Sequence, residues 1–233
     1  MRSYSRGVAN AYDHERHCKI SPVLVSAVFI LAAYLIGCIS FAIFASWLFR
    51  LPDPRTYGSG NPGATNVLRS GKKAAALLTL LGDIAKGWVA VMLAARLAPT
   101  FGLGSATIAA CGLAAFLGHL YPVYFGFKGG KGVATALGVL LGFSVWLAVL
   151  SLAVFGIVLV VSRYVSLASV AAALAAAVLA VVLFGWSDYA TAVIVLVAFV
   201  IWRHRSNLER LVAGTESKLA SRRAAMPPSD PAA

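Results

Sequence analysis

Charged residues are scarce in this chain of 233 residues. They make up 12% of it, whereas hydrophobic residues make up 60%. This balance excludes an ordinary soluble domain. Strict alternation of apolar and polar residues is also missing, which excludes an outer-membrane barrel. Several apolar runs are long enough to cross a bilayer as helices. The sequence therefore predicts an all-α, polytopic membrane protein with about seven transmembrane helices.

Acidic residues are few, with 8 Asp and Glu against 20 Lys and Arg. The basic residues gather in the connections between apolar runs, at positions 50–73, 128–131, 163 and 203–223. A basic excess in short connections predicts that they face the cytoplasm. We expect no nucleic-acid partner, because the chain has no basic soluble domain to carry one.

Cysteine is also rare. Cys18, Cys38 and Cys111 have neither the spacing of a disulfide framework nor metal-ligand partners. We interpret them as inert thiols, and we expect no metal and no cofactor. The first 20 residues are polar, and the apolar run after them is longer than the core of a signal peptide. The sequence therefore predicts a retained first helix.

The apolar runs give the expected spans. Five of them are 22–49, 74–98, 105–120, 167–184 and 190–202. The remaining run, 133–161, is too long for one simple span. A break near residues 142–144 would make it two short helices and would keep Lys131 and Arg163 on the same side of the membrane.

This arrangement gives seven helices, with the N-terminus outside and the C-terminus in the cytoplasm. Four basic residues before position 20 argue against an outside N-terminus, so six helices or an inside N-terminus remain alternatives. We expect a polar extension at 1–20, a helical membrane domain at 21–216, and a basic then Pro-rich tail at 217–233 that is disordered.

The central polar stretch follows the third apolar run. Residues 126–132 contain four glycines and two lysines, Lys128 and Lys131. Glycine lets backbone N–H groups approach a ligand, and lysine adds positive charge, so the stretch is typical of a phosphate cradle. It is not a nucleotide P-loop, because Gly132 stands where Ser or Thr is required. The structural alternative is a glycine-rich hinge.

A second polar stretch, residues 58–69, reads GSGNPGATNVLR. It combines small hydrogen-bonding residues with Arg69, whose guanidinium can bind an anion through two parallel hydrogen bonds. Turn formation and helix capping by Thr65 or Asn66 explain its composition in part. They do not explain Arg69, nor a second loop of similar chemistry on the same expected side.

Three pairs of polar residues lie three positions apart. Asp83 and Lys86 fall inside the second span, where we expect a structural ion pair near the site. Ser166 and Ser169 share a helix face, which by itself favours packing. His204 and Asn207 end the last span, and their spacing alone indicates an interfacial histidine with a helix cap.

Taken together, these stretches resemble the PlsY family of bacterial acyl-phosphate:glycerol-3-phosphate acyltransferases. The resemblance rests on GSGNPGATNVLR (58–69), GHLYPVYFGFKGGKGVAT (118–135) and RHRSNLERL (203–211) with Gly214, Thr215 and Glu216. GDIAKG (82–87) and SRYVSLAS (162–169) fit as well, and the match runs from about residue 25 to 216.

The resemblance implies a seven-helix inner-membrane enzyme. It would transfer a fatty acyl group from long-chain acyl phosphate to the 1-hydroxyl of glycerol 3-phosphate, giving lysophosphatidic acid in the first acylation of phospholipid synthesis. It also implies a link to the enzyme that makes acyl phosphate. The residues expected to act in catalysis are Ser59, Arg69, Lys131, His204 and Asn207. Those expected to bind substrate or phosphate are Gly58, Gly60, Asn61, Thr65, Asn66, Lys128, Gly129, Gly130, Gly132 and Ser169.

Three alternative functions agree less well with the sequence. Acyltransferases that use acyl-CoA carry a His-x₄-Asp signature, but Tyr124 follows His119 at that spacing, and Glu209 follows His204. A phosphate transporter would place polar residues at the middle of the membrane between repeats, and no repeat is evident. A structural scaffold leaves the Gly/Lys stretch unexplained.

Overall fold

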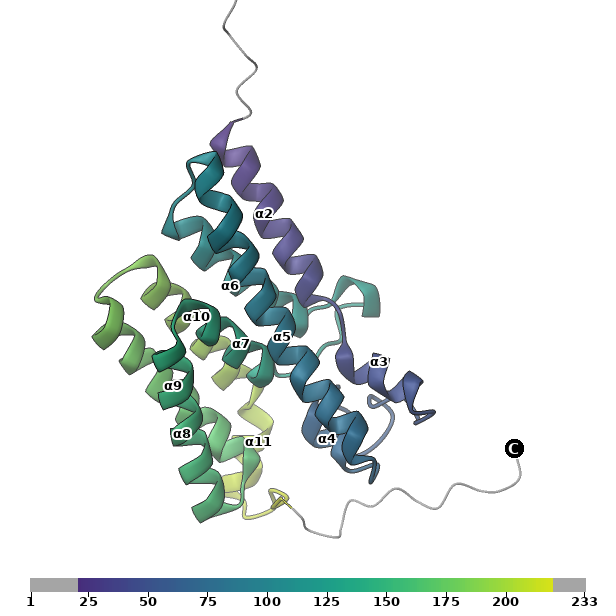
Figure 1. Cartoon of the computed structure of the whole chain (residues 1–233). Helices are drawn as coiled ribbons and strands as arrows, with labels where there is room; N and C mark the ends of the chain where they lie inside the picture. Colours follow the sequence, from purple (N-terminus) through teal and green to yellow (C-terminus); the bar gives the residue numbers. More distant parts are fainter. Residues whose placement is uncertain (1–20, 220–233) are drawn as a thin grey trace, which may run out of the picture.

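The computed structural model describes residues 21–219, whose regular structure is entirely helical with no strand (Figure 1). This confirms the all-α class. The expected segment 1–20, with Cys18, and most of the expected tail lie outside the described residues. The α-helices are α2 (Pro22–Gly37), α3 (Phe41–Leu48), α4 (Ala64–Leu68), α5 (Lys73–Leu97), α6 (Ser105–Leu120), α7 (Val133–Phe143), α8 (Val145–Ser162), α9 (Val165–Phe184), α10 (Asp188–Arg203) and α11 (Arg205–Val212); η1 (Ala98–Phe101) and η2 (Val123–Phe125) are 3₁₀ turns.

The first expected span is not one continuous helix. The chain breaks between Gly37 and Phe41, which separates α2 from α3. The Ser40 hydroxyl accepts the Ile43 N–H (3.4 Å) and begins α3, while the Ile39 carbonyl accepts a hydrogen bond from Lys86 (2.7 Å). These two interactions replace helical ones. Because the run contains no charged residue, its hydrophobicity does not indicate the break.

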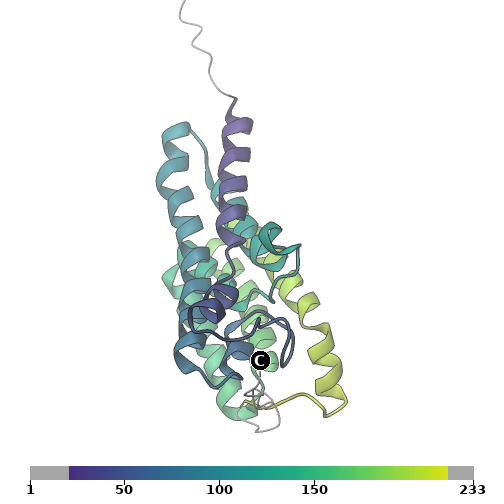
Figure 2. The ribbon, with the colours of Figure 1, turned by 90° about the vertical axis from the view of Figure 1, so that its right-hand side faces the viewer.

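Helix α5 is the centre of the bundle and packs against α2, α3, α4, α6 and α7. Its contact with α7 is close, since a Cβ on Gly138 would lie only 2.0 Å from the Ile84 carbonyl oxygen. Small residues at helix contacts give membrane bundles their tight packing. Figure 2 shows α2 and α5 running side by side along the long direction of the molecule.

The long apolar run breaks as expected, with α7 ending at Phe143 and α8 beginning at Val145. The Ser144 hydroxyl accepts the Leu147 N–H (3.4 Å) and caps α8. With 11 residues, α7 rises only about 16 Å, about half of a hydrocarbon core.

Five helical segments, the first of them α2 and α3 taken together, are long and apolar enough to cross a membrane, or six if the bent α10–α11 pair forms one span. The protein is therefore a multi-helix integral membrane protein. The expected count of seven is not confirmed by these lengths. The polar connections around α4 and α11 lie at the end of the bundle opposite the start of α2 (Figure 1).

Candidate functional site

The polar loop before α4 is held in shape by Asn66, which is 1% exposed. Its side-chain oxygen accepts the Ser59 N–H (2.9 Å), and its amide nitrogen donates to the carbonyls of Pro54 (2.7 Å) and Tyr57 (3.2 Å). The amide is therefore fully used inside the loop. Asn66 therefore supports the shape of the loop, and the Ser59 side chain is exposed on it.

Arg69 caps the C-terminus of α4 and returns towards the start of the same loop. A Cβ on Gly58 would lie 3.2 Å from Arg69 Cδ and 3.4 Å from its Nη1, so a side chain there would crowd the arginine. Gly58 and Gly60 both have left-handed backbone angles, with φ of 59° and 66°. The loop thus brings Gly58 and Ser59 beside Arg69, while Asn61 lies at the intervening turn.

The Gly/Lys loop is fixed to the last long helix by Arg203. Its guanidinium donates to the Gly129 carbonyl (2.9 Å) and to the Gly130 carbonyl (3.0 and 3.2 Å). The Gly130 N–H donates to the His119 carbonyl at the end of α6 (3.2 Å). These bonds hold the backbone just before Lys131. Gly132, which follows Lys131, has a φ of 82° and begins α7.

A chain of hydrogen bonds runs from Lys131 to the start of α9. The Lys131 ammonium donates to the Asn207 side-chain oxygen, and the Asn207 amide nitrogen donates to Glu216 (2.6 Å). Glu216 also accepts hydrogen bonds from the Ser166 hydroxyl (2.7 Å) and Arg210 (2.7 Å). Lys131 and the start of α9 therefore lie at the same end of the bundle, as the expected break between α7 and α8 requires.

The pKa of Lys131 depends on these surroundings. Burial lowers the pKa of its ammonium group to about 8. Glu216 acts in the opposite direction, and the guanidinium groups of Arg210, Arg203 and Arg69 lower the pKa further. The nearby side chains of this end of the bundle are thus mostly cationic, with Glu216 as the counter-charge. Such a region suits an anionic ligand.

His204 sits at the bend of 54° between α10 and α11 and is 3% exposed. Its Nδ1 lies 2.8 Å from the Val200 carbonyl oxygen. A carbonyl only accepts, so Nδ1 carries the proton of the neutral ring, and Nε2 keeps its lone pair. Asn207 lies on the next turn, in contact with Lys131. A buried neutral imidazole therefore lies one turn before the residue that contacts Lys131.

Three of the expected site residues stand apart from these contacts. Thr65 and Lys128 are exposed, and no hydrogen bond within residues 21–219 joins either side chain to the others. The Ser169 hydroxyl donates to the Val165 carbonyl of its own helix (2.8 Å). Their participation remains a prediction.

Two residues were missed by sequence reasoning as parts of the site. Arg203 fixes the Gly/Lys loop, and Glu216 joins α11 to α9. One sequence feature could have indicated Glu216. Between positions 189 and 217, where basic residues predominate, the only acidic residues are Glu209 and Glu216. The expected ion pair of Asp83 and Lys86 is confirmed, with 2.8 Å between Lys86 Nζ and Asp83 Oδ1. Cys38 and Cys111 are free and buried.

No group of three or more His, Cys, Asp and Glu side chains among residues 21–219 is arranged to hold a metal ion. Independence from metals and cofactors remains a prediction, which an activity assay must test.

Comparisons with known proteins extend over most of the chain. Residues 27–214 match the family model described as glycerol-3-phosphate acyltransferase. The glycerol-3-phosphate acyltransferase of Thiobacillus denitrificans is 51% identical over 199 residues, covering 85% of this chain and 100% of that protein. That of Nitrosospira multiformis is 54% identical over 193 residues, covering 83% and 96%.

The fold is also similar to a solved one. The crystal structure of PlsY, an integral membrane glycerol 3-phosphate acyltransferase, in its glycerol 3-phosphate form has a TM-score of 0.78 and 40% identity, covering 84% of this chain and 96% of that one. Its lysophosphatidic acid form has a TM-score of 0.77 and 39% identity over the same shares. The chain thus belongs to the PlsY family of integral membrane glycerol-3-phosphate acyltransferases.

Proposed function

We propose that this acyltransferase uses long-chain acyl phosphate as donor and acylates the 1-hydroxyl of glycerol 3-phosphate, releasing lysophosphatidic acid and inorganic phosphate. The observation that carries the proposal is the contact of Lys131 with Asn207, which joins the Gly/Lys loop to the His204 bend. Both substrates carry phosphate, and Arg69 and Lys131 would supply the cations that bind it. The related PlsY structures in glycerol 3-phosphate and lysophosphatidic acid forms support the acceptor and product.

The acyl group passes directly from donor to acceptor in this proposal. The acceptor hydroxyl oxygen attacks the carbonyl carbon of the acyl phosphate, and the bond from that carbon to the phosphate oxygen breaks. The hydroxyl proton is transferred to His204 Nε2 or to the donor phosphate itself. Because acyl phosphate is a mixed anhydride, positioning and charge stabilisation are the main tasks left to the protein.

Individual residues have distinct roles in this scheme. Arg69 holds a phosphate group through a bidentate fork, and Lys131 offsets charge on the departing phosphate. Ser59 and the glycine backbone N–H groups donate hydrogen bonds to phosphate oxygens. Asn207 orients Lys131 and the acceptor. No His or carboxylate within residues 21–219 is hydrogen-bonded to the Ser59 hydroxyl, which supports a binding role over a nucleophilic one.

The proposal includes the surroundings of the enzyme. The site lies at the cytoplasmic face of a bacterial inner membrane, with α7 and α8 as a hairpin and seven membrane helices in all. The exposed apolar side chains of α8, such as Val160 and Val161 at 79% and 81% exposure, face lipid. Acyl phosphate, which has a fatty chain, enters from the lipid phase, and the enzyme that makes it is the expected functional partner.

Purified protein in detergent tests the proposal. We expect release of phosphate and formation of lysophosphatidic acid from acyl phosphate and glycerol 3-phosphate, with equal rates in the presence of a chelator and without nucleotide. Acyl-CoA serves as the matched donor. Equal turnover with acyl-CoA, or loss of activity with the chelator, would contradict the proposed donor or the expected independence from metals.

A further inference from the structure

A buried polar cluster lies one layer beneath the candidate site. It consists of Asp83 and Lys86 on α5 and His119 on α6, at 2%, 4% and 7% exposure, and we call it the buried triad. Lys86 Nζ lies 2.8 Å from Asp83 Oδ1 and 2.9 Å from His119 Nδ1, and Asp83 Oδ1 lies 3.5 Å from His119 Nδ1. All three side chains therefore contact one another.

Burial of such a triad inside a membrane bundle carries a large desolvation free energy. Ion pairs removed from water rarely stabilise a fold more than apolar residues of the same size. Within residues 21–219, no hydrogen bond joins the triad to the side chains of Ser59, Arg69, Lys131, His204 or Asn207. The triad therefore does not belong to the groups expected to touch substrate, and its position needs another explanation.

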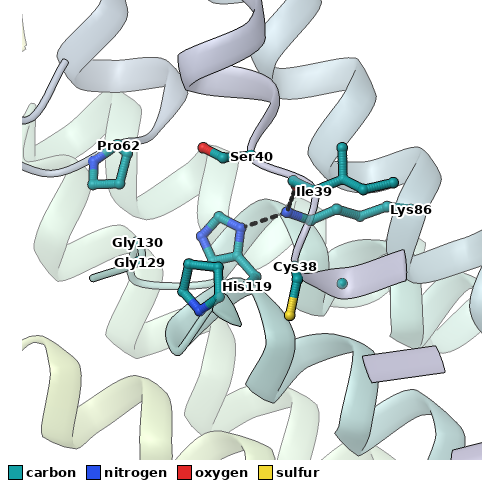
Figure 3. Close-up of a pocket in the computed structure, with 10 residues that line it drawn as sticks. Cys38, Ile39, Ser40, Pro62, Lys86, His119, Gly129 and Gly130 are labelled. Atoms are coloured by element: carbon teal, nitrogen blue, oxygen red, sulfur yellow. Dashed lines mark hydrogen bonds between the residues drawn. The ribbon is translucent and has the colours of Figure 1, made fainter. Parts of the chain in front are cut away.

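Lys86 ties the triad to the break in the first span. Its ammonium donates to the Ile39 carbonyl (2.7 Å), one of the backbone groups that the break leaves without a helical partner (Figure 3). Ser40, the next residue, caps α3. Lys86 thus stabilises an irregular backbone at the foot of the candidate site.

His119 ties the triad to the Gly/Lys loop. An ammonium only donates, so His119 Nδ1 accepts from Lys86, which fixes the ring orientation. A Cβ on Gly130 would lie 2.3 Å from His119 Nε2 and 3.1 Å from the Pro62 carbonyl oxygen. The His119 carbonyl also accepts the Gly130 N–H. Gly130 therefore packs directly against the His119 imidazole. Gly130 also lies close to Pro62 in the loop before α4.

Little free space remains between these parts. Lys86, His119, Ser40, Pro62, Gly129 and Gly130 surround a cavity of only about 10 Å³, about the space of one water molecule. On its other side, the Gly129–Gly130 segment is held by Arg203. The segment is thus clamped between His119 and Arg203, and Lys131 follows it directly.

From this geometry we propose that Asp83, Lys86 and His119 are positioning residues for phosphate binding. The triad fixes the position of the Gly129–Gly130 backbone, and this backbone in turn places Lys131 beside Asn207. The triad itself does not contact substrate. The inference rests on the proposed role of this loop in holding glycerol 3-phosphate, which the Lys131–Asn207 contact supports. Misplacement of a binding group by about 1 Å can lower reactivity about 100-fold.

The test compares variants of the triad with a control on the same helix. His119→Ala removes the ring, and His119→Gln keeps an acceptor for Lys86. Asp83→Asn with Lys86→Met removes both charges, which guards against misfolding from a single unpaired charge. Val91→Ala is the control, since Val91 is a fully buried core residue of α5 away from the loop. For each protein, glycerol 3-phosphate binding is measured by calorimetry without donor, together with thermal stability and steady-state kinetics.

We expect His119→Ala and the double variant to weaken glycerol 3-phosphate binding about 10- to 100-fold and to raise its KM more than they lower kcat. His119→Gln should recover part of the loss, and Val91→Ala should lower thermal stability without changing binding. Wild-type affinity in a folded triad variant would overturn the proposal. Equal weakening in Val91→Ala at equal loss of stability would also overturn it. Because calorimetry needs no donor, a failure of acyl phosphate as substrate would leave this test intact.

Discussion

The Lys131 ammonium group is hydrogen-bonded to the side-chain oxygen of Asn207, a residue 76 positions further along the chain. This contact joins the glycine-rich loop after α6 to the short helix after the bend at His204. Asn207 in turn reaches Glu216. Two stretches that are separated in sequence by four helices, α7 to α10, therefore form one polar region, and this geometry supports the predictions below.

Replacement of Arg69 by lysine should abolish most activity although the positive charge is kept. The planar guanidinium can donate two parallel hydrogen bonds to a phosphate, whereas an ammonium acts as a point charge. Loss of one such interaction in a transition state typically costs about 10²–10³-fold in rate. Initial rates with acyl phosphate and glycerol 3-phosphate give the measurement. Arg96→Lys, in the last turn of α5, is the matched control and should retain full activity.

Activity should fall on the alkaline side because of Lys131, whose pKa is lowered to about 8 by burial. The ammonium is charged below this pH and becomes neutral as the pH rises through it, so attraction for phosphate is lost. We expect kcat/KM for glycerol 3-phosphate to fall above about pH 8, since this parameter reports the free enzyme. In Lys131→Arg, whose guanidinium keeps its charge, the fall should move to higher pH. An unchanged profile in that variant would exclude Lys131 as its source.

No acyl-enzyme should form. The donor is already activated, and no base among the described residues is hydrogen-bonded to the Ser59 hydroxyl. Incubation with radiolabelled acyl phosphate in the absence of glycerol 3-phosphate should leave the denatured protein unlabelled. Ser59→Ala should slow turnover by removing a phosphate contact. A stable label on Ser59 that passes into product at the rate of turnover would establish a two-step route instead.

The basic connections should face the cytoplasm. Ser217, near the contact of Glu216 with Ser166, and Ser70, after α4, are the positions to replace with cysteine. Neither variant should react with a membrane-impermeant thiol reagent in intact spheroplasts, and both should react in inverted vesicles. Thr100, in the uncharged turn between α5 and α6, should show the reverse pattern. Cys38 and Cys111 are buried, and Cys18 is replaced by serine in every variant so that it adds no label of its own. Labelling of Ser70→Cys from outside would invert the proposed topology.

The sequence by itself determined the class of protein and the chemistry at its polar connections. Long apolar runs require helices in lipid, because every backbone polar group must be paired within the segment. The break near Ser144 and the ion pair of Asp83 with Lys86 follow from residue type and spacing, and the structure agrees with both. The contact of Asn207 with Lys131 does not follow from them, because the spacing of His204 and Asn207 by itself indicates a helix cap.

Tertiary structure decided what local patterns do not contain. The uncharged sequence around Cys38–Ser40 predicts a continuous helix. The chain breaks there because Lys86, from another helix, donates a hydrogen bond to the Ile39 carbonyl. Arg203 and Glu216 gain their roles only when distant carbonyl and hydroxyl groups are brought to them. In the sequence, His119 is notable only because it lacks an Asp at the spacing of the His-x₄-Asp signature. In the structure, its ring packs against Gly130 because the end of α6 contacts the Gly/Lys loop there. Contacts between residues far apart in sequence depend on how the helices pack, and periodicity within one helix does not specify that packing.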